Sequence, residues 1–195
     1  MNNLTGLNLG VALCGSFCTF SKAIQTIEAL VNLGVNVTPI MSYNAHETST
    51  RFGKASDIIS KIETLTGRPI IHTIDVSEPL GPKSMIDALL VAPCTGNTLA
   101  KLNYVITDTP VLLAAKSLMR NGKPIILCLA TNDGLGANLK NIGGILNKKN
   151  MYLVPLGQDN PVQKPYSLVA DFSKIPDTLS LALNQTQIQP VFIQY

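Results

Sequence analysis

Hydrophobic residues follow two alternating patterns along the chain. Short continuous apolar runs are typical of strands that are buried on both faces of a sheet. The stretches between them place apolar residues every three or four positions, as at Ala23, Ile27 and Leu30, and this spacing predicts helices. The apolar runs predict strands at residues 7–13, 35–41, 88–92 and 124–130.

Turn residues and amphipathic stretches predict what connects these strands. Gly34, Gly67 and Gly122 each follow a helical pattern and are expected to end a helix. The polar residues 44–50 predict a loop, and the proline- and glycine-rich residues 78–83 predict a connection of fixed conformation. Helices are predicted at residues 21–33, 54–66, 98–103, 110–121, 138–147 and 177–184, a short extended piece at 69–74, a last short strand at 152–155 and an extended tail from about residue 185.

The order of these elements predicts the fold class. Repeated alternation of a strand and a helix is typical of a doubly wound parallel sheet with helices on both faces. The chain has 195 residues, which is long enough to bury one core without disulfides or metal ions. We therefore expect a single α/β domain over residues 1–195, a flavodoxin-like or Rossmann-like three-layer sandwich.

Composition indicates an aliphatic core and no membrane contact. Hydrophobic residues make up 46% of the chain and aromatic residues only 5%, so Val, Ile, Leu and Ala are expected to fill the core. No apolar run approaches the roughly 20 residues that a membrane-spanning helix needs. The first residues lack the charged segment and cleavage pattern of a secretory signal, so a cytoplasmic protein is expected.

Charge and cysteine content exclude two further kinds of partner. The formal net charge of +3 comes from scattered basic residues with one adjacent pair at 148–149, so no nucleic-acid surface is expected. Cysteines occur at positions 14, 18, 94 and 128. They lack the spacing of zinc ligands, so no metal site is expected. All but Cys18 fall in or beside predicted strands, which indicates buried thiols in a reducing compartment.

Small and hydroxyl-bearing residues follow three of the predicted strands. Gly15 and Ser16 follow the first strand, and residues 93–98 and 130–132 follow two later ones. The carboxyl ends of parallel strands meet at one edge of the sheet, where helix N-termini offer N–H groups to anions. Two interpretations stay open: ordinary turns and helix caps, or a mononucleotide or flavin site. The sequence contains neither the dinucleotide pattern Gly-x-Gly-x-x-Gly nor a Walker A loop.

Side chains for acid–base catalysis are few. His46 lies in a polar segment and His72 in a short extended piece, where surface exposure or packing accounts for them. The sequence shows no Ser/His/Asp set with a nucleophile elbow, so no catalytic residue is assigned. An anion-binding edge without an acid–base pair indicates that a cofactor carries the chemistry.

The segment Pro93-Cys94-Thr95-Gly96-Asn97-Thr98 with Lys101 resembles the signature of a flavoprotein family that includes phosphopantothenoylcysteine decarboxylase and lantibiotic decarboxylases. Residues 15–16 resemble the first flavin-phosphate loop of that family, and residues 130–132 resemble its substrate motif. The resemblance implies that FMN is the cofactor. The FMN-binding residues that it implies are Gly15, Ser16, Phe17, Ser42, Pro93, Thr95, Asn97, Thr98 and Lys101.

A second resemblance covers nearly the whole chain and is to the family of dipicolinate synthase B subunits. It implies an oxidoreductase that works with the dipicolinate synthase A subunit to oxidise dihydrodipicolinate to dipicolinate with NAD(P), in the mother cell of a sporulating bacterium. The A subunit resembles a Rossmann dehydrogenase and would bind NAD(P), and the wider flavoprotein family implies a homo-oligomer. The segments that carry the resemblance are residues 49–53, 78–83, 107–108, 110–112, 114–116, 131–136, 155–161 and 164–165.

The chain departs from the family's decarboxylases at three places. Those enzymes place a histidine shortly before the third strand and a cysteine on a flap, whereas residues 78–83 and 157–165 occupy these regions here. Leu129 and Thr131 replace a proline and a methionine of the substrate motif. Cysteine-type decarboxylation is therefore not expected. Two alternatives to a redox function stay open, namely a non-catalytic substrate-binding or scaffolding subunit that keeps a flavin-like crevice, and an FMN-dependent decarboxylase.

Dipicolinate and its precursor are small dianions, so their site needs fixed hydrogen-bond donors. Arg51 and Lys83 each offer a cation to a carboxylate, and the guanidinium group suits bidentate binding. For Arg51 an exposed loop position is the open alternative. Asn132 offers an amide, and Asp133 is expected to cap a helix or to contact the ligand. These four are the predicted substrate-binding residues.

Overall fold

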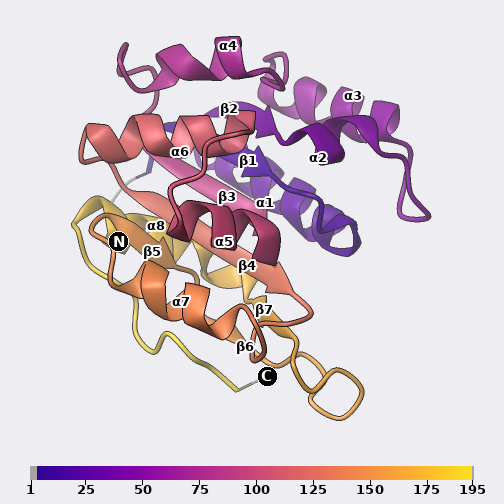
Figure 1. Ribbon diagram of the computed structural model, residues 1–195. Coiled ribbons are helices and arrows are strands. Elements are labelled where there is room, and N and C mark those ends of the chain that lie inside the picture. The colour runs from indigo at the N-terminus through magenta and orange to yellow at the C-terminus, as the bar shows by residue number, and fades with distance from the viewer. Residues whose placement is uncertain (1–3, 195) are drawn as a thin grey trace.

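A computed structural model describes residues 4–194, and a mixed sheet of seven strands forms the centre of this part of the chain (Figure 1). The strand order is β2-β1-β3-β4-β7-β6, and β5 pairs with β4 outside this path. The predicted doubly wound α/β fold is confirmed. The strands are β1 (Asn8–Leu13), β2 (Asn36–Met41), β3 (Ala88–Cys94), β4 (Ile125–Thr131), β5 (Met151–Leu153), β6 (Leu156–Gly157) and β7 (Leu168–Ala170).

Helices cover both faces of the sheet. The helices α5, α6 and α7 lie together on one face, and α1 and α8 lie on the other (Figure 1). At the edge of the sheet α3 packs on α1 and β2. The helices are α1 (Phe20–Asn32), α2 (Tyr43–Glu47), α3 (Ala55–Thr66), α4 (Ile74–Ser77), α5 (Gly96–Asn103), α6 (Pro110–Arg120), α7 (Leu139–Leu146) and α8 (Ile175–Leu183), with 3-10 turns η1 (Phe17–Thr19), η2 (Glu78–Leu80) and η3 (Phe172–Lys174).

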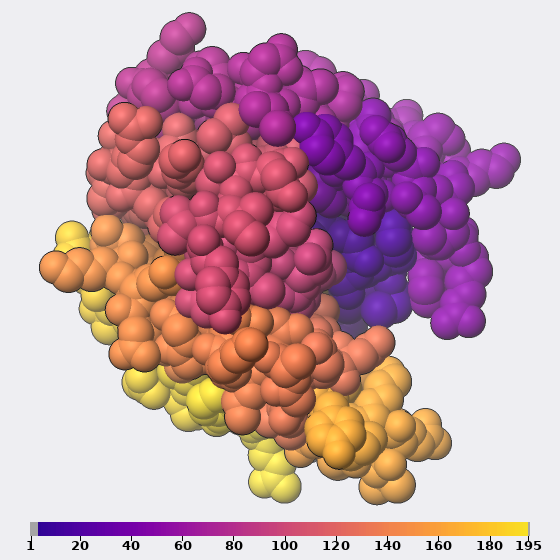
Figure 2. All heavy atoms as spheres, viewed as in Figure 1, coloured from indigo at the N-terminus to yellow at the C-terminus, as the bar shows by residue number. Residues whose placement is uncertain are grey.

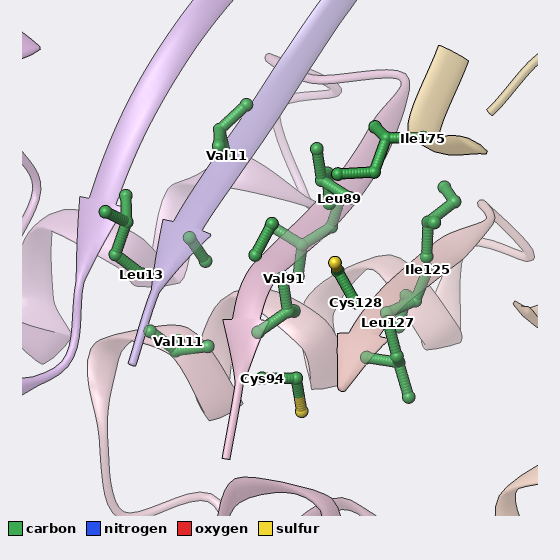
Figure 3. Packing of buried hydrophobic residues seen from close by; sticks show 14 of the residues in the cluster. Val11, Leu13, Leu89, Val91, Cys94, Val111, Ile125, Leu127, Cys128 and Ile175 are labelled. Carbon is green, nitrogen blue, oxygen red and sulfur yellow. The ribbon is translucent and has the colours of Figure 1, made fainter. Parts of the chain in front are cut away.

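The core is aliphatic, as composition predicts. All seven residues of β3 are buried, because α6 covers one face of this central strand and α1 covers the other. Figure 3 shows the side chains of β1, β3 and β4 between Val111 of α6 and Ile175 of α8. Strands that are covered on both faces have no polar side to present to solvent, which explains why they read as continuous apolar runs.

The secondary structure corrects three predictions. Residues 44–50 are not all loop, because they contain most of α2, which Ser42 caps by accepting a hydrogen bond from the N–H of Ala45 at 3.4 Å. Residues 152–155 do not contain the last strand, because β6 and β7 follow. These two strands pair antiparallel to each other, and β7 pairs antiparallel to β4, so the sheet is mixed rather than parallel. Strands of two or three residues are too short to show a period in the sequence.

The extended tail after α8 is bound to the sheet. The side-chain amide of Gln187 donates to the carbonyl of Leu153 at 2.7 Å, and its oxygen accepts from the N–H of the same residue at 2.9 Å. Further along, Leu156 donates to Val191 and Ile193 donates to Leu156, both at 3.0 Å through the backbone. The tail therefore satisfies polar groups of β5 and β6 that edge strands would otherwise leave open.

Two adjacent glycines of α7 differ in how closely they approach α5. A Cβ atom on Gly143 would meet no other atom within 4 Å, whereas one on Gly144 would overlap the side chain of Asn103, with its Cγ at 2.8 Å. Gly143→Ala is expected to raise the free energy of unfolding by up to about 1 kcal/mol because alanine favours a helix. Gly144→Ala is expected to lower it by about 1–3 kcal/mol through overpacking. Urea unfolding of both variants measures this difference, and equal effects would contradict the close packing.

Candidate functional site

The parallel pairing of β1, β3 and β4 brings three turns to one edge of the sheet. Val91 of β3 lies opposite Ala12 of β1 and Leu127 of β4. Just beyond these pairs, the N–H of Cys14 donates to the carbonyl of Pro93 at 3.1 Å. The residues that follow each strand therefore share one edge.

A cavity of about 770 Å³ opens at this edge, a size that suits a small ligand. Its floor consists of the turns after β1, β3 and β4, including Gly15, Thr95 and residues 130–133. Two loops form its walls. One carries Arg51 and Phe52 between α2 and α3, and the other follows β6 and carries Asp159 and Lys164. In Figure 2 these loops, purple and light orange, project on either side of a hollow.

The walls of the larger cavity carry both signs of charge. Lys164 Nζ lies 3.5 Å from Asp159 Oδ2, so these two groups largely neutralise each other. Arg51 lies over the ring of Phe52, with 4.9 Å between Cζ and the ring centroid. Within residues 4–194, neither Arg51 nor Lys22 forms a salt bridge with a carboxylate. These two cations are therefore available to an anionic ligand.

The carboxylate of Asp133 faces the same cavity and is held from behind. The hydroxyl of Thr131 and the side-chain amide of Asn138 both donate to Asp133 Oδ1 at 2.7 Å. These hydrogen bonds, the one from Thr131 first, hold the pKa of this carboxyl below its usual value. Asp133 is therefore ionised at neutral pH.

A second cavity of about 410 Å³ lies beside the first and shares Gly15 and Thr95 with it. Ser42 and Thr95 cap α2 and α5, and each hydroxyl oxygen accepts a backbone N–H, with 3.2 Å between Thr98 N and Thr95 Oγ1. Ser42 therefore keeps its hydroxyl proton to donate to a ligand, whereas the Thr95 and Thr98 hydroxyls lie 3.0 Å apart and share one hydrogen bond. Lys101 Nζ lies 2.6 Å from Asp108 Oδ2 at this cavity, so its charge is already paired.

The structure brings together most of the residues that the sequence singles out. Pro93 lines neither cavity, although its carbonyl joins the turns after β1 and β3. Lys83 lies between η2 and β3, at the amino ends of the strands, and therefore at the opposite edge of the sheet. The residues that line one or both cavities are Gly15, Ser16, Phe17, Ser42, Arg51, Thr95, Asn97, Thr98, Lys101, Asn132 and Asp133.

Sequence reasoning missed Lys22, Asp159 and Lys164 at the larger cavity. Lys22 lies in the first turn of α1, directly after the Gly15 turn, and this closeness in sequence is a signal that points to it. The other two lie in a loop that the antiparallel pairing of β6 and β7 carries to the cavity. No pattern in the sequence predicts that pairing.

His46 and His72 lie away from both cavities and stack on each other. Their ring centroids are 3.9 Å apart, and their planes differ by 4°. Burial lowers the pKa of His46, and His72 lowers it further. His46 is half-buried rather than fully exposed, and His72 is exposed, one of the two positions that the sequence allows for it. Among the residues that the structure describes, no group of three or more His, Cys, Asp or Glu side chains is placed to hold a metal ion, and no helix is long and apolar enough to cross a membrane.

Comparisons with known proteins agree with this geometry. The sequence profile of the Flavoprotein family matches residues 1–164. The chain belongs to the flavoprotein family. It is 43% identical over 194 residues to the B subunit of dipicolinate synthase from Bacillus subtilis (strain 168), an alignment that covers 100% of this chain and 97% of that protein.

Two solved structures superpose on this one and share its fold. The dipicolinate synthase B subunit from Bacillus halodurans C superposes with a TM-score of 0.90 at 43% identity, covering 98% of each chain. The FMN-dependent cysteine decarboxylase SpaF superposes with a TM-score of 0.71 at 20% identity, covering 93% of this chain and 98% of that one. At 20% identity, the second comparison supports the shared fold alone.

The reactivity of the four cysteines tests which thiols are buried and which one is exposed at the larger cavity. Cys14, Cys94 and Cys128 are buried, as predicted, and burial raises their pKa values, that of Cys14 to about 11. Cys18 is exposed and lines the larger cavity. We expect one thiol per folded chain to react rapidly with a disulfide reagent at mildly alkaline pH, and four after unfolding. Cys18→Ser should abolish the rapid phase, whereas a rapid phase that survives this substitution would contradict the burial of the other three.

Proposed function

We propose that the chain acts as the B subunit of a dipicolinate synthase and that its larger cavity binds the dicarboxylate substrate. The full-length identity of 43% to such a protein supports this assignment. The observation that carries it is that Arg51 and Lys22, neither in a salt bridge with a described carboxylate, line one cavity together with Asn132. Two cations and an amide are suitable donors for two carboxylates that are attached to one small ring.

The proposed reaction removes two hydrogens from dihydrodipicolinate. One leaves as a hydride to the nicotinamide of NAD(P)⁺ and the other as a proton, so the ring becomes aromatic and NAD(P)H forms. The sequence has no dinucleotide-binding pattern, so a partner, the A subunit, supplies the nicotinamide site in this proposal. The proposal places both proteins in the cytoplasm of the mother cell of a sporulating bacterium.

Substrate binding without catalysis by this chain is the second candidate. The observation that favours it is that no histidine lines the larger cavity, where the described titratable side chains are those of Cys18, Asp133, Asp159 and three cations. The chain would then present dihydrodipicolinate to the partner enzyme. An FMN-dependent decarboxylase fits less well, because the loop after β6 brings Asp159 and Lys164 to the cavity where the family's decarboxylases carry a cysteine flap.

The smaller cavity fits the FMN that the family implies. Ser42 keeps a hydroxyl proton to donate, the Thr95 and Thr98 hydroxyls share one hydrogen bond, and the N-terminus of α5 adds backbone N–H groups. We assign Gly15 and Asn97 to the same group of binding residues because they line this cavity, and Ser16, which follows Gly15 and lines the larger cavity, on the family resemblance. FMN supplies two-electron redox chemistry when it is bound.

A homo-oligomer is part of the proposal, because apolar side chains are exposed beside the site. Tyr104, Val105 and Ile106 follow α5 directly and are 61%, 55% and 45% exposed. Leu139 of the neighbouring α7 is 47% exposed. A run of exposed apolar residues such as 104–106 on a folded protein indicates a protein interface.

An activity assay that combines the chain with its proposed partner tests the function. NAD(P)H should form from dihydrodipicolinate only when this chain is mixed with the A subunit. Arg51→Ala is expected to weaken substrate binding about tenfold or more, because a hydrogen bond to a charged group contributes about 1.5–3 kcal/mol. Lys83→Ala is the matched comparison, because it removes a cation at the opposite edge and should leave KM unchanged. Full activity of the isolated partner, without this chain, would overturn the proposal.

Flavin uptake is tested separately by the fluorescence of added FMN, which is quenched when the flavin binds. Ser42→Ala is expected to weaken FMN binding about tenfold, because it removes one donor to a charged phosphate. Ser60→Ala, on the exposed side of α3, serves as the control that removes a hydroxyl elsewhere. If the wild-type chain neither carries nor takes up FMN, the flavin part of the proposal is wrong, and the substrate-binding part is unaffected.

A further inference from the structure

A line of buried amides runs from the end of α5 to the larger cavity. Asn103 Nδ2 donates to Asn141 Oδ1 at 3.1 Å, and Asn141 Nδ2 donates to Asn138 Oδ1 at 2.9 Å. Asn138 Nδ2 then donates to Asp133 Oδ1 at 2.7 Å. Asn138 and Asn141 are 9% and 4% exposed, so water has little access to this line.

The carboxylate at its end fixes the direction of every bond in this line. An ionised carboxylate only accepts, so Asn138 must turn its NH₂ group to Asp133 and its oxygen to Asn141. Asn141 in turn must present its oxygen to Asn103. Each amide therefore has one orientation, and Asp133 is held in place through two buried residues of the α7 region.

The N-terminus of α5 packs against the end of this line that contacts Asp133. A Cβ atom on Gly96 would lie 2.5 Å from Asn138 Nδ2 and 2.6 Å from Thr131 Oγ1. These are the two groups that donate to Asp133. The turn after β3 therefore packs directly on the support of this carboxylate, and it leaves Asn138 and Thr131 no room to turn away.

One oxygen of Asp133 remains for a ligand. Among the residues that the structure describes, both side-chain hydrogen bonds to this carboxylate fall on Oδ1. Asp133 is half-buried and lines the larger cavity, so Oδ2 is the acceptor that the cavity offers. A carboxylate acceptor attracts an N–H or O–H group and repels a lone pair. The cations Arg51 and Lys22 in the same cavity require acceptors on the ligand instead.

We propose that Asp133 makes the larger cavity selective for a dicarboxylate whose ring carries an N–H or O–H donor, and that it disfavours an aromatic ring whose nitrogen offers only a lone pair. This inference rests on the proposed function, since it takes the ligand of that same cavity to be a ring dicarboxylate. The nitrogen of a reduced ring carries hydrogen when it is an amine, an enamine or a protonated imine, and in these forms it can donate to Asp133. The pyridine nitrogen of dipicolinate does not. Aromatisation therefore removes the group that Asp133 binds, and the product leaves more readily than the substrate.

Two probes with the same pair of carboxylates differ in whether the ring nitrogen carries hydrogen, and comparing their affinities tests the selectivity. These are cis-piperidine-2,6-dicarboxylate, with a protonated ring nitrogen, and dipicolinate, with a bare one. Calorimetric titration of the wild-type chain, both in isolation and in the presence of its proposed partner, is expected to show the piperidine compound binding about tenfold tighter or more. Asp133→Asn should reverse this preference, because the amide oxygen can still accept from Thr131 and Asn138 while its NH₂ donates to the pyridine nitrogen.

Asp177→Asn is the matched control. It makes the same substitution on the exposed first turn of α8, and the ratio of the two affinities should stay at the wild-type value. If both probes bind the wild type equally and Asp133→Asn leaves the ratio unchanged, the selectivity is refuted and the proposed function stands. If neither probe binds the wild type under either condition, the proposed function fails, and the selectivity fails with it.

Discussion

The parallel pairing of β1, β3 and β4 is the constraint on which the site depends. Hydrogen bonds of a parallel ladder fix how far each strand extends past its neighbour, and a shift of register would disrupt the close packing of side chains against the helices. Because helices cover both faces of these strands, no slip is tolerated on either side. The turns after the three strands therefore end at one level. Gly15, Thr95 and Asp133, which lie far apart in the sequence, line one cavity as a result.

The packing of α5 on α7 adds a second, polar constraint. Buried amides cost free energy unless each donor and acceptor is paired. Asn141 and Asn138 meet this condition through each other, Asn103 and Asp133. A Cβ atom on Gly144 would overlap Asn103 at one end of this line, and a Cβ atom on Gly96 would overlap Asn138 near the other. The two glycines thus let the helices approach until the amides meet, and this packing holds the carboxylate of Asp133 in place.

The sequence predicted the sheet and the strand ends well because long buried strands leave a strong pattern. The run at 88–92 and the hydroxyl residues after it were enough to locate the centre of the sheet and one wall of each cavity. Positions that depend on tertiary contacts were not predictable. Both Arg51 and Lys83 lie in polar loops beside turn residues, yet the fold carries one to the cavity and the other to the opposite edge. The amides of α7 gave no signal either, because an asparagine in a helix is usually exposed.

The larger cavity has two halves with different physical properties. Its floor consists of strand ends and the supported carboxylate of Asp133, where buried hydrogen bonds hold each group in one orientation. Its walls carry Arg51 and Lys22, which have exposed side chains and no salt bridge with a described carboxylate. Exposed cations attract any small anion and discriminate little, because water competes for them and their side chains adjust. Rigid groups discriminate between ligands because they cannot adjust. The cations of the walls therefore attract carboxylates in general, and the floor of the cavity determines which ring dicarboxylate binds most tightly.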